Sequence, residues 1–158
     1  MNIYKNFLQK ADLEKLHDYM MSDYFPWYYN DQINYKGDGH FQFTYLFMKN
    51  EEPNCNKATW DLLTPILSQL KFKNLMRVKA NLLLQTPKIE EHHFHIDQPS
   101  GTTGIFYIND NNGYTKFEEG TKVKSEKNKY VEFDSKLKHT GTTCTDARRR
   151  VVINFNYQ

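Results

Sequence analysis

Hydrophobic and polar residues alternate with a period of two from residue 75, as they do in a half-buried β-strand. One side of this segment is mostly apolar and carries Met76, Val78, Ala80, Leu82 and Leu84. The other side is polar and carries Arg77, Lys79, Asn81 and Gln85. Further short segments of strand-like composition follow at residues 93–96, 103–109, 114–117, 121–124, 129–133, 138–141 and 149–157. Many short strands with no helix between them predict an antiparallel sandwich or barrel.

Turn residues separate these predicted strands. The run Asp110-Asn111-Asn112-Gly113 is typical of a tight β-hairpin. The run Glu118-Glu119-Gly120 indicates a second turn. The first of these runs predicts that the strands on either side of it pair with each other.

The first half of the chain mixes helical and strand-like patterns. Leu13, Leu16 and Met20 share one helical face, and Asp12 is the expected N-cap. Residues 41–48 alternate like a strand, and Trp60, Leu63, Leu67 and Leu70 then recur at helical spacing. Pro65 interrupts that spacing, which predicts either a kink or a new helix capped by Thr64. We therefore expect one domain over residues 1–158, with a helical and mixed front half (1–74) packed on a β-rich core (75–158).

Length, charge and cysteine content narrow the class of protein. A chain of 158 residues suits one domain, and an aromatic content of 15% favours packed sheets. The formal net charge of +2 gives no electrostatic signal for nucleic acid or membrane. The two cysteines are too few for a disulfide framework, and no signal peptide or membrane span is evident. These features predict a protein of a reducing compartment, the cytoplasm.

One short motif carries the candidate chemistry. In His95-Ile96-Asp97, an imidazole and a carboxylate lie on the same side of an extended chain. His139, in a later predicted strand, can supply a third ligand. Two histidines and one carboxylate on one face of an octahedral ion leave three positions open, as in non-haem Fe(II) oxygenases. A His-x-Asp pattern alone occurs often by chance, so the surrounding sequence decides its meaning.

The sequence around this motif resembles the 2-oxoglutarate/Fe(II)-dependent dioxygenase superfamily. The segments that carry the resemblance are Ile105-Phe106-Tyr107-Ile108-Asn109 after the motif, Asn128-Lys129-Tyr130-Val131-Glu132-Phe133 before His139, and Arg150-Val151-Val152-Ile153-Asn154-Phe155 after it. The chain looks most like short, single-domain microbial and phage-type members of the prolyl-4-hydroxylase-like branch. The resemblance is specific from Arg77 to Gln158, and the aromatic run 25–29 adds a looser similarity.

The resemblance implies a double-stranded β-helix, the jelly roll that cupins also have. It implies that His95, Asp97 and His139 bind the iron. It also implies that Arg150, with Arg149 as the fallback, pairs with the far carboxylate of 2-oxoglutarate. Tyr107 would donate its hydroxyl to the same carboxylate, and Asn154 would line the pocket.

The same resemblance implies the cofactors and the reaction. Fe(II), 2-oxoglutarate as cosubstrate and O2 would support hydroxylation of a C–H bond with release of succinate, and ascorbate would be an accessory reductant. Halogenating members lack the carboxylate ligand, so Asp97 favours a hydroxylase. The expected location is the cytoplasm, or the host cytoplasm if a phage encodes the protein.

A peptidyl residue, proline first, is the substrate that the resemblance favours, and a free amino acid or other small metabolite is the alternative. The aromatic stretch 27–31 fits either a peptide groove or a core strand, with the core strand favoured. Nucleic-acid demethylases of the superfamily have a second Arg where this chain has Asn156, so no nucleic-acid partner is expected. The sequence gives no oligomeric state.

Simpler interpretations stay open beside these. The run Arg148-Arg149-Arg150 fits a solvated charge cluster, and Tyr107 fits a core position. His93 shares a strand face with His95 and competes with it as a ligand. A non-catalytic jelly-roll module that binds metal, or a cupin-type enzyme that needs no 2-oxoglutarate, would also have this fold. The retained ligands and Arg150 favour the oxygenase.

Overall fold

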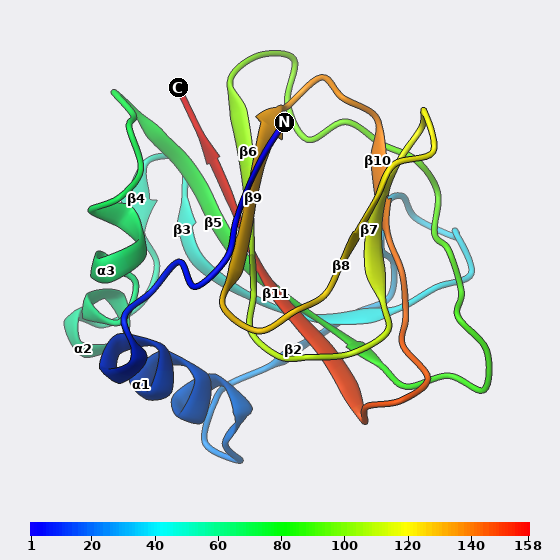
Figure 1. The fold of residues 1–158 in the computed structure, drawn as a ribbon, viewed down its shortest axis with the longest axis horizontal. Helices are drawn as coiled ribbons and strands as arrows, with labels where there is room; N and C mark the ends of the chain where they lie inside the picture. The colour runs from blue at the N-terminus through cyan, green and yellow to red at the C-terminus, as the bar shows by residue number, and fades with distance from the viewer.

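A computed structural model describes residues 1–158 and shows two antiparallel β-sheets with three helices on one side (Figure 1). The elements of the first half are β1 (Asn2–Tyr4), α1 (Lys10–Met21), β2 (Tyr28–Asn30), β3 (Gln42–Lys49), β4 (Glu52–Pro53), α2 (Lys57–Asp61) and α3 (Thr64–Leu67). Those of the second half are β5 (Leu75–Leu84), β6 (Thr102–Tyr107), β7 (Tyr114–Phe117), β8 (Lys122–Lys124), β9 (Lys129–Asp134), β10 (His139–Gly141) and β11 (Arg149–Tyr157).

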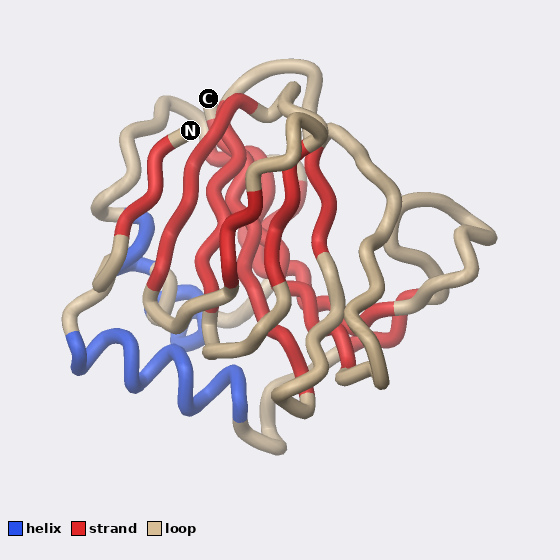
Figure 2. Tube along the Cα trace, turned by 45° about the vertical axis from the view of Figure 1, so that its right-hand side comes forward, coloured by secondary structure: helices blue, strands red, loops and turns tan.

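The two sheets form the jelly roll that the family resemblance implied, and they agree with the antiparallel sandwich or barrel that the strand pattern predicted. The large sheet has the order β1-β9-β6-β11-β5-β3-β2, with β4 paired to β3, and the small sheet has the order β10-β7-β8. The strands of the two sheets run side by side in Figure 2, with the helices outside them. Strands β1, β2 and β3 come from residues before 75, so the front half extends the large sheet as well as covering it.

Each face of the large sheet buries its own hydrophobic core. The face toward the helices packs residues from α1 and α3 on strand residues, among them Leu16, Met20, Ile66, Val78, Ala80, Ile153 and Phe155. The face toward the small sheet packs Ile105, Tyr107, Val131, Phe133 and Val152 against Phe117 and Val123. Strand β11 lies between β5 and β6 and contributes to both cores, because its alternate residues point to opposite faces.

Two predicted helix caps, Asp12 and Thr64, are wrong. Gln9 occupies the N-cap position of α1, so Asp12 lies in the first turn instead. Asn56 caps α2, where its side chain accepts a hydrogen bond from the amide of Thr59 at 2.9 Å. A new helix does begin at Thr64, as one of the two alternatives predicted, but Leu63 holds its cap position.

The predicted strands 114–117 and 149–157 match β7 and β11, whereas other predictions need correction. Residues 93–96 form no strand and contribute only an isolated bridge between His95 and His139. Leu84, placed on the apolar side of β5, is 43% exposed at the end of that strand. The turn at 118–120 does join a paired hairpin, β7 and β8.

Residues 110–113 do not close a hairpin. Strand β6 pairs with β9 and β11, while β7 pairs with β8 and β10, so this segment crosses from one sheet to the other. Its asparagines satisfy the local backbone: Asn111 accepts from the amide of Gly113 at 3.0 Å and donates to the carbonyl of Asn109 at 3.1 Å. The same residues that favour a tight turn therefore stabilise a connection between sheets.

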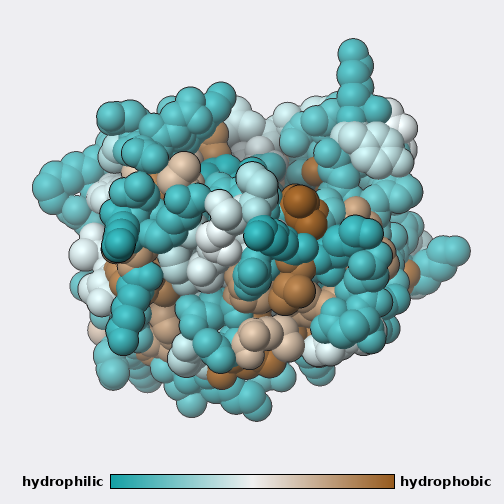
Figure 3. All heavy atoms as spheres, turned by 90° about the horizontal axis from the view of Figure 1, so that it is seen from above, coloured by the Kyte–Doolittle hydropathy of each residue, from teal (hydrophilic) through white to brown (hydrophobic).

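The surface is mainly hydrophilic in the view from above, with hydrophobic atoms gathered near the middle of that face (Figure 3). None of the three helices has the length and apolar character needed to cross a lipid bilayer.

Gly104 marks the closest packing in the large sheet. A Cβ at this position would overlap the ring and hydroxyl of Tyr130. Tyr130 is fully buried, and its hydroxyl lies 3.2 Å from the hydroxyl of Tyr157. We predict that Gly104→Ala lowers the free energy of unfolding by about 1–3 kcal/mol in urea denaturation, because a filled core resists added volume. Gly141→Ala is the matched control, since its Cβ would meet only the guanidinium of Arg150 at 3.5 Å. Equal stability of the two variants would contradict this account of the packing.

Candidate metal centre

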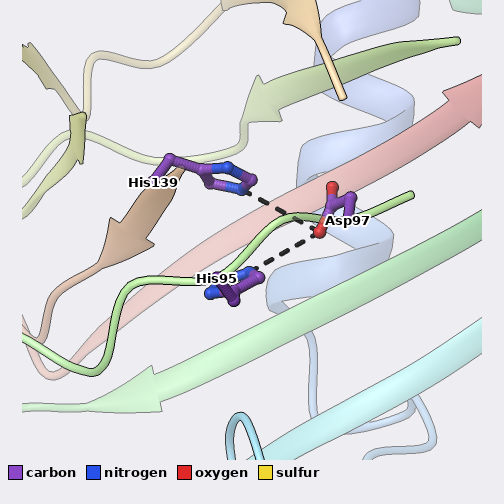
Figure 4. A group of neighbouring side chains, drawn as sticks. All are labelled: His95, Asp97 and His139. Carbon is purple, nitrogen blue, oxygen red and sulfur yellow. Dashed lines mark ion pairs between the residues drawn. The ribbon is translucent and has the colours of Figure 1, made fainter. Parts of the chain in front are cut away.

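His95, Asp97 and His139 converge, although residue 139 lies far from the other two in sequence. Their potential ligand atoms all lie within 4.8 Å of one another. The Nε2 atoms of His95 and His139 lie 3.5 and 3.9 Å from the same oxygen, Oδ1 of Asp97 (Figure 4). Three such groups around one point can hold a divalent cation and leave coordination positions free.

The backbone brings the two histidines together. His139 opens strand β10, and its amide and carbonyl exchange hydrogen bonds with those of His95, each 3.0 Å long. Asp97 follows in the same loop, and its amide donates to the carbonyl of Ser135 at 3.3 Å. The loop from β5 to β6 is thus fixed to the small-sheet side of the molecule at the residues that carry the candidate ligands.

The large sheet orients the carboxylate. Oδ2 of Asp97 accepts hydrogen bonds from the hydroxyl of Thr103 at 3.0 Å and from the side-chain amide of Asn156 at 3.1 Å. Arg77 in turn donates through Nε to Oδ1 of Asn156 at 2.9 Å. These bonds occupy one carboxylate oxygen and leave Oδ1 directed at the two imidazoles.

Electrostatics keep Asp97 ionised. Its side chain is only 4% exposed, and this burial by itself raises the pKa. Hydrogen bonding to His95, the electrostatic interaction with His139 and the positive charge of Arg77 outweigh the burial, so the pKa of Asp97 lies well below its ordinary value. A carboxylate that stays charged is the form that binds a metal ion.

His139 has the protonation pattern of a metal ligand. Its Nδ1 lies 2.9 Å from the carbonyl of Leu137, which places the ring proton on that nitrogen. Its Nε2 is buried and has no hydrogen-bond partner. Burial also lowers the pKa of His139, which favours the neutral ring. The donor set therefore fits a divalent transition metal such as Fe(II), because an orphaned buried nitrogen gains its partner when metal binds.

The competing histidine lies outside this group. His93 directs its Nε2 to the hydroxyl of Tyr35 at 3.1 Å, and its side chain is not among the three that converge. Because residues 93–96 are not a regular strand, the alternation that placed His93 beside His95 does not hold there.

Arg150 forms a second feature in the same pocket, a buried cation without a carboxylate partner. It is 3% exposed, and its guanidinium donates to the hydroxyls of Ser125 at 2.8 Å and Thr115 at 3.3 Å. No acidic side chain lies within 4.0 Å of it, and burial lowers its pKa. A buried charge without a counter-ion is costly, so the site is suited to an anionic ligand.

Neighbouring residues fix where Arg150 points. Tyr107 is fully buried and donates to the hydroxyl of Thr115 at 2.8 Å, so it reaches the guanidinium through that hydroxyl. A Cβ on Gly113 would lie 2.7 Å from Cδ of Arg150, which shows how closely the backbone approaches. Arg149 points the other way and donates to the carbonyl of Met21, at the end of α1.

One pocket of about 270 Å³ is lined by both the three candidate metal ligands and Arg150. Asn154 lines it as well, and its Oδ1 is buried without a donor. Sequence reasoning gave no role to several other lining residues: Gln42, Arg77, Lys79, Asn81, His92 and Thr115. The alternation in β5 did place Arg77, Lys79 and Asn81 on one face, which was the available signal. Nothing in the sequence singled out Thr115 or His92.

Comparison with known proteins supports the fold. No protein-family model matches the chain, and no curated protein matches it by sequence. A prolyl hydroxylase from Trichoplax adhaerens, solved with a hypoxia-inducible-factor oxygen degradation domain peptide, superposes with a TM-score of 0.72 at 12% identity, over 99% of this chain and 82% of that one. A Pseudomonas putida prolyl-4-hydroxylase gives a TM-score of 0.62 at 13% identity, over 99% and 91%.

A third structure extends the set to viruses. The collagen prolyl hydroxylase of Paramecium Bursaria Chlorella virus-1 gives a TM-score of 0.55 at 15% identity, over 98% of this chain and 87% of that one. This chain has the fold of the prolyl hydroxylases. The resemblance predicted from the sequence is thus confirmed at the level of the fold, and the likeness covers nearly the whole chain.

The support of Asp97 by Asn156 yields a prediction. Asn156→Ala removes one donor to the carboxylate, so we expect the affinity for Fe(II) under anaerobic conditions to fall by about 10-fold or more, measured by titration. Asn154→Ala is the control, because it lies on the same face of β11 but has no bond to Asp97. An unchanged affinity in a folded Asn156→Ala variant would show that Thr103 alone orients the carboxylate.

Proposed function

We propose that the protein is an Fe(II)- and 2-oxoglutarate-dependent oxygenase that hydroxylates a C–H bond. The observation that carries this proposal is a three-ligand cluster and an unpaired buried arginine in one pocket. A metal-binding group alone would fit many proteins. A cationic anchor at the other end of the pocket suits a metal-bound ligand with a second carboxylate, which 2-oxoglutarate is.

His95, Asp97 and His139 would hold the iron, which supplies the activation of O2 and the oxidation of the C–H bond when it is bound. Arg150 would pair with the far carboxylate of 2-oxoglutarate and orient the molecule toward the iron. Tyr107 would support that contact through Thr115, and Asn154 and Val152 would line the space between. Succinate and CO2 are the expected products from the cosubstrate, and ascorbate would serve as an accessory reductant.

A peptidyl residue, proline first, is the substrate class that we propose. The Trichoplax adhaerens prolyl hydroxylase was solved with a peptide, which supports a peptide substrate for this fold. Tyr28 and Tyr29 on the edge strand β2 are 63% and 60% exposed, so the core-strand interpretation is wrong for these two residues. Trp27 packs against Phe25 beside the core. A free amino acid or small metabolite is the alternative substrate.

Two alternatives without this activity are less consistent with the pocket. A non-catalytic metal-binding module would not need a buried cation near the ligand cluster, and a cupin-type enzyme without 2-oxoglutarate would leave Arg150 without a counter-ion.

The two cysteines of the chain, Cys55 and Cys144, are both free. Free thiols agree with the reducing cytoplasm as the proposed location.

The role of Arg150 is tested by turnover of 2-oxoglutarate. We expect the wild-type protein with Fe(II) to release succinate, even without a hydroxylated substrate. Arg150→Ala should raise the KM for 2-oxoglutarate by about 30-fold or more and leave Fe(II) affinity intact, because it removes the partner of a buried carboxylate. Arg149→Ala is the matched control and should behave like wild type. Unchanged kinetics in Arg150→Ala would exclude it as the anchor.

The metal ligands are tested separately. His139→Ala should abolish Fe(II) binding and succinate release, because the remaining two ligands cannot complete the facial site. His93→Ala should retain both, since His93 lies outside the cluster. If His93→Ala loses iron and His139→Ala does not, the assignment of the third ligand is wrong.

A further inference from the structure

We propose that Lys79, together with Arg77, binds a carboxylate of the organic substrate, at a position distinct from the 2-oxoglutarate anchor. This inference rests on the proposed function and names the chemistry of the substrate. The residue was not singled out by the metal motif or by the resemblance. The inference follows from two facts about Lys79: its side chain lines the pocket, and its ammonium group has no partner there.

Lys79 is a half-buried cation with no partner. It lines the pocket from β5, and its ammonium group makes neither a hydrogen bond nor an ion pair. Burial, reinforced by the nearby charge of Arg77, lowers the pKa of Lys79 to about 8. Arg77 binds Asn156 and lies 3.8 Å from Asp97, so it is partly neutralised. An unpaired ammonium in a pocket wall is suited to an anion brought by a ligand.

The balance of charge in the pocket points the same way. Its lining contains three basic side chains, Arg77, Lys79 and Arg150, and one carboxylate, Asp97. Fe(II) and the dianion 2-oxoglutarate would cancel each other when both are bound. The pocket would then still be positive, and a substrate with a carboxylate would reduce that excess.

Strand register separates Lys79 from the anchor. Lys79 lies opposite Asn154 of β11, whereas Arg150 lies opposite Leu83. Four strand residues correspond to about 13 Å along the sheet. Arg77 is two residues from Lys79 on the same face and is next to Asp97, so this cationic pair is at the metal end of the pocket. Along the strands, Lys79 lies between the level of Asn156, which binds Asp97, and the level of Arg150. It projects from β5, one strand to the side of the β11 residues that a 2-oxoglutarate molecule bound to Arg150 would follow, and this sideways offset is what would separate the two carboxylate positions.

Asn154 adds a polar group at the same level of the sheet. Its Oδ1 is buried and accepts no hydrogen bond, and it lies directly across the β5–β11 pair from Lys79. A ligand bound there meets a cation and a free acceptor side by side. Such a pair is complementary to a carboxylate with a neighbouring N–H, the arrangement found in amino acids and in acidic peptides.

The shared chemistry is a carboxylate close to the C–H bond that reacts. It has two sources: the α-carboxylate of a free amino acid, or an acidic side chain next to the target residue of a peptide. The test therefore uses both. One panel contains free amino acids and their carboxamides, and the other contains proline peptides with Asp or Glu beside proline and their Asn or Gln counterparts.

The experiment compares wild type, Lys79→Met and Lys79→Arg, with the exposed Lys71→Met as control. Hydroxylation is detected by mass spectrometry, and binding is measured by calorimetry with Fe(II) and 2-oxoglutarate under anaerobic conditions. We expect carboxylate compounds of one panel to bind and react. Lys79→Met should weaken their binding at least about tenfold and leave the KM for 2-oxoglutarate unchanged, and Lys79→Arg should restore most of it.

Three results would overturn the inference. Neutral counterparts that bind and react as well as the carboxylates would exclude a subsite for an anion, as would the absence of any carboxylate whose binding depends on Lys79. A KM for 2-oxoglutarate that rises in Lys79→Met would assign the lysine to the cosubstrate instead. The proposed function fails by a different result, the lack of succinate release from the wild-type protein.

Discussion

The position of one carboxylate, Asp97, determines the rest of the site. Its oxygen Oδ2 is held by Thr103 of β6 and Asn156 of β11, and its Oδ1 meets the two imidazoles. The loop that carries it has no regular structure, so these bonds to the large sheet replace strand geometry as the positioning device. Because a buried carboxylate without such donors would be strongly destabilised, the sheet and the ligand cluster depend on each other.

Arg150 differs from Asp97 because no oppositely charged side chain faces its buried charge. Its guanidinium donates hydrogen bonds to hydroxyl groups instead. Thr115 belongs to β7 of the small sheet, and Ser125 directly follows β8 of the same sheet. Arg150 belongs to β11 of the large sheet. The guanidinium therefore bridges the two sheets. An anionic ligand would offset the cost of burying this charge without a carboxylate partner, so its binding would stabilise this end of the pocket.

The strand pattern predicted an antiparallel sandwich or barrel and most of its strands, and the resemblance to the oxygenases implied the jelly roll and the three residues that converge at the candidate metal centre. The prediction succeeded where periodicity was strong, as in β11, and where a motif fixed the spacing, as in His95 and Asp97. It failed at residues 110–113, because turn-forming asparagines equally stabilise a connection between sheets. It also could not find Thr115 or Ser125, because a hydroxyl that solvates a distant cation leaves no local pattern.

Strand β11 explains how these parts form one site. Its pocket-facing residues are Arg150, Val152, Asn154 and Asn156, and each meets a different requirement. Arg150 supplies a cation and Val152 an apolar wall. Asn154 supplies an unpaired acceptor, and Asn156 donates a hydrogen bond to Asp97. Its central position between β5 and β6 keeps these residues in register with Lys79 and Arg77 across one pair and with Thr103 across the other. A slip of one residue would turn all four away from the pocket, so pairing of β11 fixes the chemistry along its length.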